Sequence, residues 1–239
     1  MTGVTGAPRS VLVTRPDADA ADTARRLQTL GFMAVAAPAL RIEQRQMRLS
    51  GTFRPQAILV TSGNALASLP ATLHGVPLLA VGDATARKAG ALGFAAIRSA
   101  RGDAGDLARL ASETLIPAAG ALLLASGAGQ GVSLAAGLRK HGFRVLHRLA
   151  YATRPVPALP EPARRALQAG LVEAALFFSA ASARATVAQF RRAGLPDAAR
   201  GVTAVAISAA TAAALAPLPW RSIRVASNPD QDELLACLR

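Results

Sequence analysis

The chain contains one pair of segments twice, and this repeat limits the possible folds more than any other feature of the sequence. Residues 57–65 read AILVTSGNA and residues 79–86 read LAVGDATA. Each is a short apolar run that ends in small polar residues before a stretch suited to a helix. Residues 175–182 (ALFFSAAS) and 204–212 (AVAISAATA) repeat the pair in the same order. Since an apolar run leading directly into a helix start is typical of a βα unit, the repeat predicts two similar α/β halves.

The small polar residues at the ends of these runs indicate where a ligand would bind. A strand that enters a helix through Ser, Thr or Gly leaves unpaired N–H groups and the positive end of the helix dipole at one place, where anions bind. Four such ends in two similar halves predict two domains that face each other, with an anionic ligand held between them. The alternative is structural, with Ser62, Asp83, Ser179 and Ser208 serving as ordinary helix N-caps.

The order of the predicted strands indicates that one domain is inserted into the other. The middle of the chain has five predicted strands, at 57–61, 78–81, 95–98, 121–125 and 143–146. The outer pieces together also have five, at 11–14, 34–37, 174–178, 203–207 and 223–226. The N-terminal piece is too short to fold alone, so we predict that it joins the C-terminal piece. Domain 1 then comprises 1–37 and 155–239, domain 2 comprises 44–147, and residues 38–43 and 148–154 connect the two domains. The predicted fold class is α/β, with two similar domains that each contain a five-stranded parallel sheet flanked by helices.

The charge of the chain favours an acidic ligand. Among 239 residues the formal net charge is +13, and it is carried by scattered arginines with only two lysines. This pattern fits attraction of acidic small molecules, or an arginine-rich genome, as well as it fits nucleic acid. With one Trp and one Tyr, the chain offers few side chains on which bases could stack, which disfavours nucleic acid.

The sequence predicts a cytoplasmic location. The single cysteine, Cys237, cannot form an internal disulfide, which fits a reducing compartment. Residues 1–10 lack the apolar core of a signal peptide. The uncharged run 202–219 fits a strand followed by an alanine-rich helix better than it fits a membrane span.

The motifs of common cofactor enzymes are incomplete in this chain. Gly127 and Gly129 begin like a dinucleotide-binding fingerprint, but Val132 stands where its third glycine belongs. There is no Gly-x-Ser-x-Gly elbow and no Walker loop. The histidines share no metal-ligand spacing; they are His74, His141 and His147. We therefore predict that the protein uses neither a metal nor an organic cofactor.

A series of short motifs, taken in order, resembles the uroporphyrinogen-III synthase family over nearly the whole chain. The motifs are Val13-Thr14-Arg15-Pro16, Pro38-x-Leu40, Thr61-Ser62-x-Asn64-Ala65, Val81-Gly82-Asp83-Ala84-Thr85-Ala86, Gly102-Asp103-Ala104 with Leu107-Ala108, Tyr151 ahead of Pro155, Phe177-Phe178-Ser179-x-x-Ser182, Ile207-Ser208-x-x-Thr211-Ala212 and Ala226-x-x-Pro229. Each motif is short, and their order and spacing together carry the resemblance.

The resemblance implies a cofactor-independent lyase of haem and other tetrapyrrole biosynthesis. Members of this family close linear hydroxymethylbilane into uroporphyrinogen III and invert the terminal pyrrole ring through a spiro intermediate, with loss of water. The family fold is two α/β domains joined by a two-stranded connector. The many acetate and propionate groups of hydroxymethylbilane suit the hydroxyl-rich strand ends and the basic charge of this chain.

The resemblance also suggests roles for individual residues. The residues expected to bind substrate carboxylates are Arg15, Thr61, Ser62, Asn64, Thr85, Ser126, Gly127, Ser179, Ser182, Ser208 and Thr211. Tyr151 lies at the family's tyrosine position, and it is expected either to assist departure of the hydroxyl or to orient the last ring. The alternative for Tyr151 is a purely structural hydrogen bond.

Two other function classes stay open from the residues alone. A non-enzymatic two-domain protein could close on an anion with the same architecture, and a basic nucleic-acid binder comes third. For the enzyme, we expect a monomer that binds hydroxymethylbilane and has transient contact with hydroxymethylbilane synthase, and that binds neither nucleic acid nor membrane.

Overall fold

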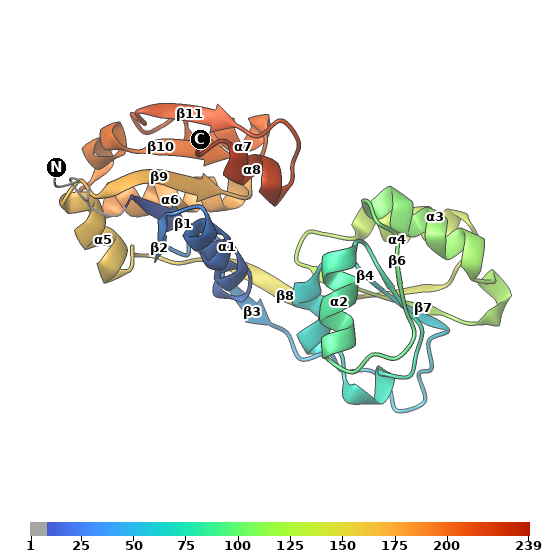
Figure 1. The fold of residues 1–239 in the computed structure, drawn as a ribbon. Helices are drawn as coiled ribbons and strands as arrows, with labels where there is room; N and C mark the ends of the chain where they lie inside the picture. Colours follow the sequence, from blue (N-terminus) through green and yellow to red (C-terminus); the bar gives the residue numbers. More distant parts are fainter. Residues whose placement is uncertain (1–8) are drawn as a thin grey trace. The chain divides into compact units, whose positions relative to one another are not determined.

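The chain divides into two compact units. The structure, a computed structural model, describes residues 9–239, so the prediction about a signal peptide lies mostly outside it. Unit 1 comprises the described residues up to Arg41 together with Arg154–Arg239, and unit 2 comprises Ile42–Thr153. Unit 1 is thus built from both ends of the chain, and unit 2 is the segment between them (Figure 1).

Unit 1 contains a five-stranded parallel sheet. Its strands are β1 (Ser10–Val13), β2 (Met33–Ala36), β9 (Val172–Phe177), β10 (Thr203–Ala206) and β11 (Ser222–Val225). Their spatial order is β11-β10-β9-β1-β2, and every pair is parallel. The central strands are short and almost wholly buried, whereas the edge strands β2 and β11 are largely exposed. This is the pattern expected for a parallel sheet covered on both faces.

Helices cover both faces of this sheet. They are α1 (Asp17–Thr29), α5 (Glu161–Gln168), α6 (Ala180–Arg192), α7 (Ala209–Leu215) and α8 (Gln231–Ala236), with a 3₁₀ helix η4 (Pro196–Gly201). Because side chains alternate along β1, Leu12 packs with Phe190 of α6 on one face. Val11 packs with Leu27 of α1 and Leu234 of α8 on the other face. Figure 1 shows α1 and α8 on one side of the strands and α6 on the opposite side.

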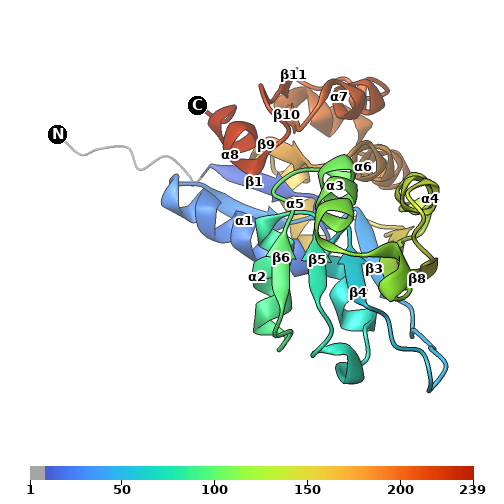
Figure 2. The same ribbon diagram turned by 90° about the vertical axis from the view of Figure 1, so that its right-hand side faces the viewer.

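Unit 2 repeats this architecture. Its parallel strands are β4 (Ala57–Val60), β5 (Leu78–Ala80), β6 (Ile97–Ser99), β7 (Leu122–Gly127) and β8 (Val145–Pro155). Its helices are η1 (Gly63–Ser68), η2 (Ala71–Leu73), α2 (Asp83–Ala91), α3 (Ala104–Thr114), η3 (Pro117–Ala119) and α4 (Val132–Lys140). Ile58 packs toward η1, η2 and α2, whereas Leu59 packs toward α3 and α4, which lie next to each other in Figure 2. The predicted α/β fold with helix-flanked parallel sheets is therefore confirmed.

The connector consists of two paired strands, as the family resemblance implies, but its bounds differ from the prediction. The predicted fifth strand at 143–146 and the predicted connector at 148–154 form one continuous strand, β8, because no Gly or Pro interrupts the chain before Pro155. The strand β3 (Leu40–Gln44) lies beside β8, so the sheet has six strands where five were predicted. The Arg45 N–H donates to the Ala150 carbonyl (2.8 Å) and the Val156 N–H donates to the Ala39 carbonyl (2.9 Å). Residue numbers rise along one strand as they fall along the other, so this pair is antiparallel.

The strand orders explain the repeat in the sequence. Unit 1 has the order β11-β10-β9-β1-β2, and the five parallel strands of unit 2 have the order β6-β5-β4-β7-β8. The repeated pairs, β4 with β5 and β9 with β10, therefore occupy the same positions in the two sheets. The two units therefore share one spatial arrangement of strands. The chain enters this arrangement at different strands in the two units, and unit 2 is inserted after the second strand of unit 1. Among the described residues, no helix has the length and apolar character needed to cross a membrane.

Candidate functional site

Each sheet has one place where the direction of chain progression reverses. In unit 1 the chain moves from β1 to β2 on one side and from β9 through β10 to β11 on the other, so the reversal lies between β1 and β9. In unit 2 it lies between β4 and β7 for the same reason. Open α/β sheets bind ligands outside the carboxyl ends of their strands at such points. Most of the predicted site residues directly follow strands at or next to these two places.

Arg15 lies at the carboxyl end of β1 and is held in position. Its Nη1 donates to Oε1 of Gln231 (2.6 Å), and its guanidinium carbon lies 4.2 Å from the centre of the Phe178 ring. Phe178 follows β9, so this contact joins the two strands that flank the reversal. Stacking on the Phe178 ring and the hydrogen bond to the Gln231 side-chain amide orient the guanidinium, a group whose paired N–H donors match a carboxylate.

Ser179 and Ser208 cap the helices that follow β9 and β10. The Ser179 hydroxyl accepts from the Ser182 N–H (3.1 Å), and the Ser208 hydroxyl accepts from the Thr211 N–H (3.3 Å). Ser182 and Thr211 are buried, and each hydroxyl lies 3.1 Å from the hydroxyl of its cap residue. Ser179 and Ser208 are half-buried, so in each pair it is the cap residue that a ligand could reach. Ser182 and Thr211 act behind them, by fixing the cap hydroxyls.

In unit 2, Thr61 and Ser62 follow β4 directly. The Thr61 hydroxyl is buried and has no hydrogen-bond partner among residues 9–239. Ser62 caps η1 by accepting from the Asn64 N–H (3.2 Å), and the Asn64 carbonyl accepts from Nε2 of Gln44 (3.2 Å). The helix predicted after residue 63 is a 3₁₀ helix. These three predicted residues thus share one turn at the carboxyl end of β4.

The turn after β5 does not use Asp83 as a helix N-cap, which was the structural alternative for this residue. Gly82, and not Asp83, is the N-cap of α2, and Asp83 is the first helical residue. Its carboxylate lies 3.8 Å from the Arg101 guanidinium. Thr85 is buried in the first turn of α2. A carboxylate already occupies this helix start, so we expect it to be the least favourable of the four strand ends for an anion.

Ser126 and Gly127 build a small cluster around Tyr151. Ser126 is fully buried, and its hydroxyl lies 2.7 Å from Nε2 of His147 and donates to the Gln130 carbonyl (2.9 Å). The Tyr151 hydroxyl donates to Oε1 of Gln130 (3.2 Å). A Cβ atom on Gly127 would lie 2.7 Å from the Tyr151 ring, so only glycine leaves room for that ring. Ser126 and Gly127 were predicted to bind substrate, and their contacts here position Tyr151 and the loop beside it.

The burial of His147 should make stability depend on pH. Burial, and then the positive charge of Arg139, lower the pKa of His147, so the folded protein binds this proton less tightly than the unfolded chain does. The contribution of neutral His147 to the free energy of unfolding is therefore fully present above the ordinary histidine pKa. It is lost as pH falls through the lower pKa that His147 has in the folded protein. We expect the free energy of unfolding to fall between about pH 7.5 and about pH 5.5, and to fall less in His147→Gln. Urea titrations of both proteins at the two pH values measure this difference, and equal slopes would contradict it.

Several residues at these places were not predicted from the sequence. Phe178 and Gln231, which orient Arg15, come from different segments of unit 1. Gln130 and His147 both contact the Ser126 hydroxyl. His147 carries no metal-ligand spacing to the other histidines, so a metal-site pattern does not single it out. A search for a polar residue at the end of each strand would have found His147 but not Gln130.

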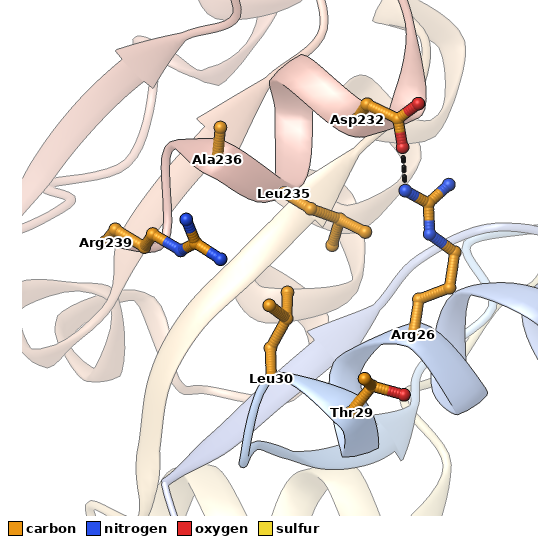
Figure 3. Close-up of a pocket in the computed structure, with 7 residues that line it drawn as sticks. All are labelled: Arg26, Thr29, Leu30, Asp232, Leu235, Ala236 and Arg239. Atoms are coloured by element: carbon orange, nitrogen blue, oxygen red, sulfur yellow. Dashed lines mark hydrogen bonds and ion pairs between the residues drawn. The ribbon is translucent and has the colours of Figure 1, made fainter.

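A pocket in unit 1 lies away from the predicted site residues. It has a volume of about 350 Å³ and lies between α1 and α8, where Leu30 and Leu235 face each other and Arg26 pairs with Asp232 (Figure 3). It is formed by the C-terminal half of α1, which in a right-handed βαβ unit lies toward the start of the next strand. The pocket is therefore at the opposite end of the sheet from Arg15, and none of the predicted substrate-binding residues lines it.

The fold matches solved structures of one kind of enzyme. Uroporphyrinogen-III synthetase from Helicobacter pylori 26695 is 17% identical to this chain, with a TM-score of 0.65 over 96% of this chain and 98% of that chain. A mutant uroporphyrinogen III synthase from the extremely thermophilic bacterium Thermus thermophilus is 20% identical, with a TM-score of 0.47 over 96% of each chain. At this identity the first of these likenesses shows the fold.

The sequence comparisons give the family. No curated protein compared with this chain matches it. The family model described as uroporphyrinogen-III synthase HemD matches residues 21–236, which is most of the chain and includes both units. The chain therefore belongs to the uroporphyrinogen-III synthase family.

Proposed function

We propose that this protein is a uroporphyrinogen-III synthase that closes hydroxymethylbilane into uroporphyrinogen III. The observation that carries the proposal is the family match over residues 21–236. The substrate loses its terminal hydroxyl as water, and the resulting electrophilic carbon bonds to the substituted carbon of the last pyrrole ring. The spiro intermediate then fragments and recloses with that ring inverted. Substrate and products are at the same oxidation level, so the reaction needs no redox cofactor, and its class is that of a cyclising lyase.

The strand ends of both units support binding of a polycarboxylate. Unit 1 offers the oriented Arg15 guanidinium and the half-buried hydroxyls of Ser179 and Ser208. Unit 2 offers the turn at Thr61 and Ser62. Hydroxyl groups, N–H groups at helix starts and guanidinium groups are the donors that carboxylates require. We propose that each set binds substrate carboxylates.

The protein's main task would be to impose one conformation on a flexible chain. Hydroxymethylbilane ionises and cyclises without a catalyst and then gives the isomer in which the last ring is not inverted. Fixing several carboxylates favours one arrangement of the reacting ends, which is the kind of help that positioning gives. The formal net charge of +13 would also speed capture of the polyanion, because opposite charge raises association rates.

The test is to resolve the product isomers. Hydroxymethylbilane is made in situ by purified hydroxymethylbilane synthase, with and without this protein, and the oxidised porphyrins are separated by chromatography. We expect the type III isomer with the protein and the type I isomer without it. Type I alone in both reactions would overturn the proposal. Binding of hydroxymethylbilane without type III product would instead support the two-domain anion-binding protein.

A further inference from the structure

The loop 127–131 holds an exposed amide in one fixed position. Gln130 lies between two glycines in the left-handed region, Gly129 (φ 74°) and Gly131 (φ 78°), which lets the chain turn sharply here. The Gln130 N–H donates to the Gly127 carbonyl (3.0 Å). The Gln130 carbonyl accepts from the Ser126 hydroxyl (2.9 Å), which also contacts His147. The backbone of Gln130 is thus tied on both sides although its side chain faces the surface.

The Tyr151 hydroxyl fixes the side chain of Gln130 as well. Tyr151 is only 4% exposed, and its hydroxyl donates to Oε1 of Gln130 (3.2 Å). A buried phenol must place its hydrogen on an acceptor, so the oxygen of the Gln130 amide faces inward. The Nε2 group then faces outward, and among residues 9–239 it has no hydrogen-bond partner.

The charge around this amide suits an anion. The loop 127–131 contains no acidic residue, and the first turn of α4, which follows it, contains none. A carboxylate approaching Nε2 would therefore meet no repulsion from this segment. A hydrogen bond to a charged acceptor is worth more than one between neutral groups, and an amide held in advance loses little entropy in forming it.

We propose that Gln130 binds a carboxylate of the substrate through Nε2, and that Tyr151 is a positioning residue that acts through Gln130. This inference rests on the proposed function and deepens it. It differs from a direct role of the Tyr151 phenol at the departing hydroxyl, because the phenol hydrogen is already bonded to the amide and the ring is buried. The substrate then meets the amide, and the phenol lies behind it.

The test compares Gln130→Ala, Gln130→Glu, Tyr151→Phe and the double variant Gln130→Ala/Tyr151→Phe in the type III assay. Gln130→Glu keeps an acceptor for the phenol but places a negative charge where the substrate carboxylate binds. We expect it to raise KM about 10-fold or more with kcat nearly unchanged. This is the result expected when an interaction that is equally strong in the bound substrate and in the transition state is lost. Gln28→Glu, on the exposed face of α1, makes the same change in net charge and should leave KM within about 2-fold.

The double variant separates positioning from direct catalysis. If Tyr151 acts through Gln130, Tyr151→Phe raises KM in the wild-type background and has little further effect once Gln130 is Ala. A fall in kcat of about 100-fold on adding Tyr151→Phe to Gln130→Ala would overturn the proposal, since that size is typical of general acid catalysis. Equal KM values for Gln130→Glu and Gln28→Glu would overturn it too.

A spectroscopic readout does not depend on activity. Tyr151 is the only tyrosine in the chain, so isotope-labelled tyrosine reports on this one hydroxyl in the infrared spectrum. We expect Gln130→Ala to shift the phenol C–O stretching band and Gln28→Glu to leave it in place. An unshifted band in Gln130→Ala would overturn the assigned hydrogen bond. If wild type forms no type III isomer while the band shifts as expected, the proposed function fails and the Tyr151–Gln130 contact stands.

Discussion

Replacing Gly127 with alanine should abolish most type III synthesis, because the new methyl group has no space beside Tyr151. The added Cβ would lie 2.7 Å from Cζ, 2.9 Å from Cε2 and 2.9 Å from the hydroxyl oxygen of Tyr151. The ring cannot easily move aside, since the Ala128 N–H donates to the Tyr151 carbonyl (2.9 Å) and the hydroxyl is bonded to Gln130. A forced shift therefore displaces the Gln130 amide. We expect type III formation to fall by about 10 to 100-fold and the free energy of unfolding to fall by about 1 to 3 kcal/mol.

Gly137→Ala is the matched control for this substitution. Gly137 lies inside α4 of the same unit, with nothing within 4 Å of the added Cβ, so alanine should stabilise the helix by about 0.5 to 1 kcal/mol and leave the rate unchanged. The loss of stability in Gly127→Ala should also shrink when Tyr151→Leu is added, since the two side chains then no longer overlap. A Gly127→Ala protein with wild-type rate and stability would show that the ring is not confined as described.

Much of the fold follows from patterns that are local in the sequence. Buried strands such as 57–60 and 175–177 are continuous apolar runs, and small polar residues mark where each helix begins. The connector was harder to place, because β3 and β8 come from distant segments and no Gly or Pro marks an end of β8 before Pro155. Propensity alone cannot show whether two adjoining extended segments form one strand.

The site was only partly accessible from the sequence. Hydroxyl residues at strand ends were found because a βα turn places them there, as for Ser179 and Ser208. The side of the sheet that Ser126 faces could not be predicted, because β7 is buried on both faces. Its sequence therefore has no alternation of apolar and polar residues that would distinguish the two faces. The Gln130 contact depends on two glycines with positive φ, a conformation that sequence does not specify.

Gln189→Glu should destabilise unit 1 more than any other single substitution discussed here. Gln189 is fully buried in α6, and its Nε2 donates to three backbone carbonyls, those of Pro38 (3.4 Å), Val156 (2.9 Å) and Ala158 (3.2 Å). These carbonyls lie where the chain leaves unit 1 and where it returns. A glutamate would keep the shape but place a carboxylate against three carbonyl oxygens. We expect the free energy of unfolding at neutral pH to fall by about 3 to 5 kcal/mol, the cost of an uncompensated buried charge.

The pH dependence of this loss identifies its cause. Burial among carbonyls favours the protonated glutamic acid, so the folded protein binds this proton more tightly than the unfolded chain does. The variant should therefore recover part of its deficit as pH falls toward about 5, when each pH is compared with wild type. Thr186→Val, one turn earlier in α6, is the control: the Thr186 hydroxyl is buried without a partner among the described residues, so valine should be neutral or stabilising at every pH. Two outcomes would contradict this account: a loss in the free energy of unfolding that stays constant with pH, or an equal loss in Thr186→Val. Either would mean that α6 tolerates no change here and that the Gln189 hydrogen bonds do not stabilise the segments where the chain leaves and re-enters unit 1.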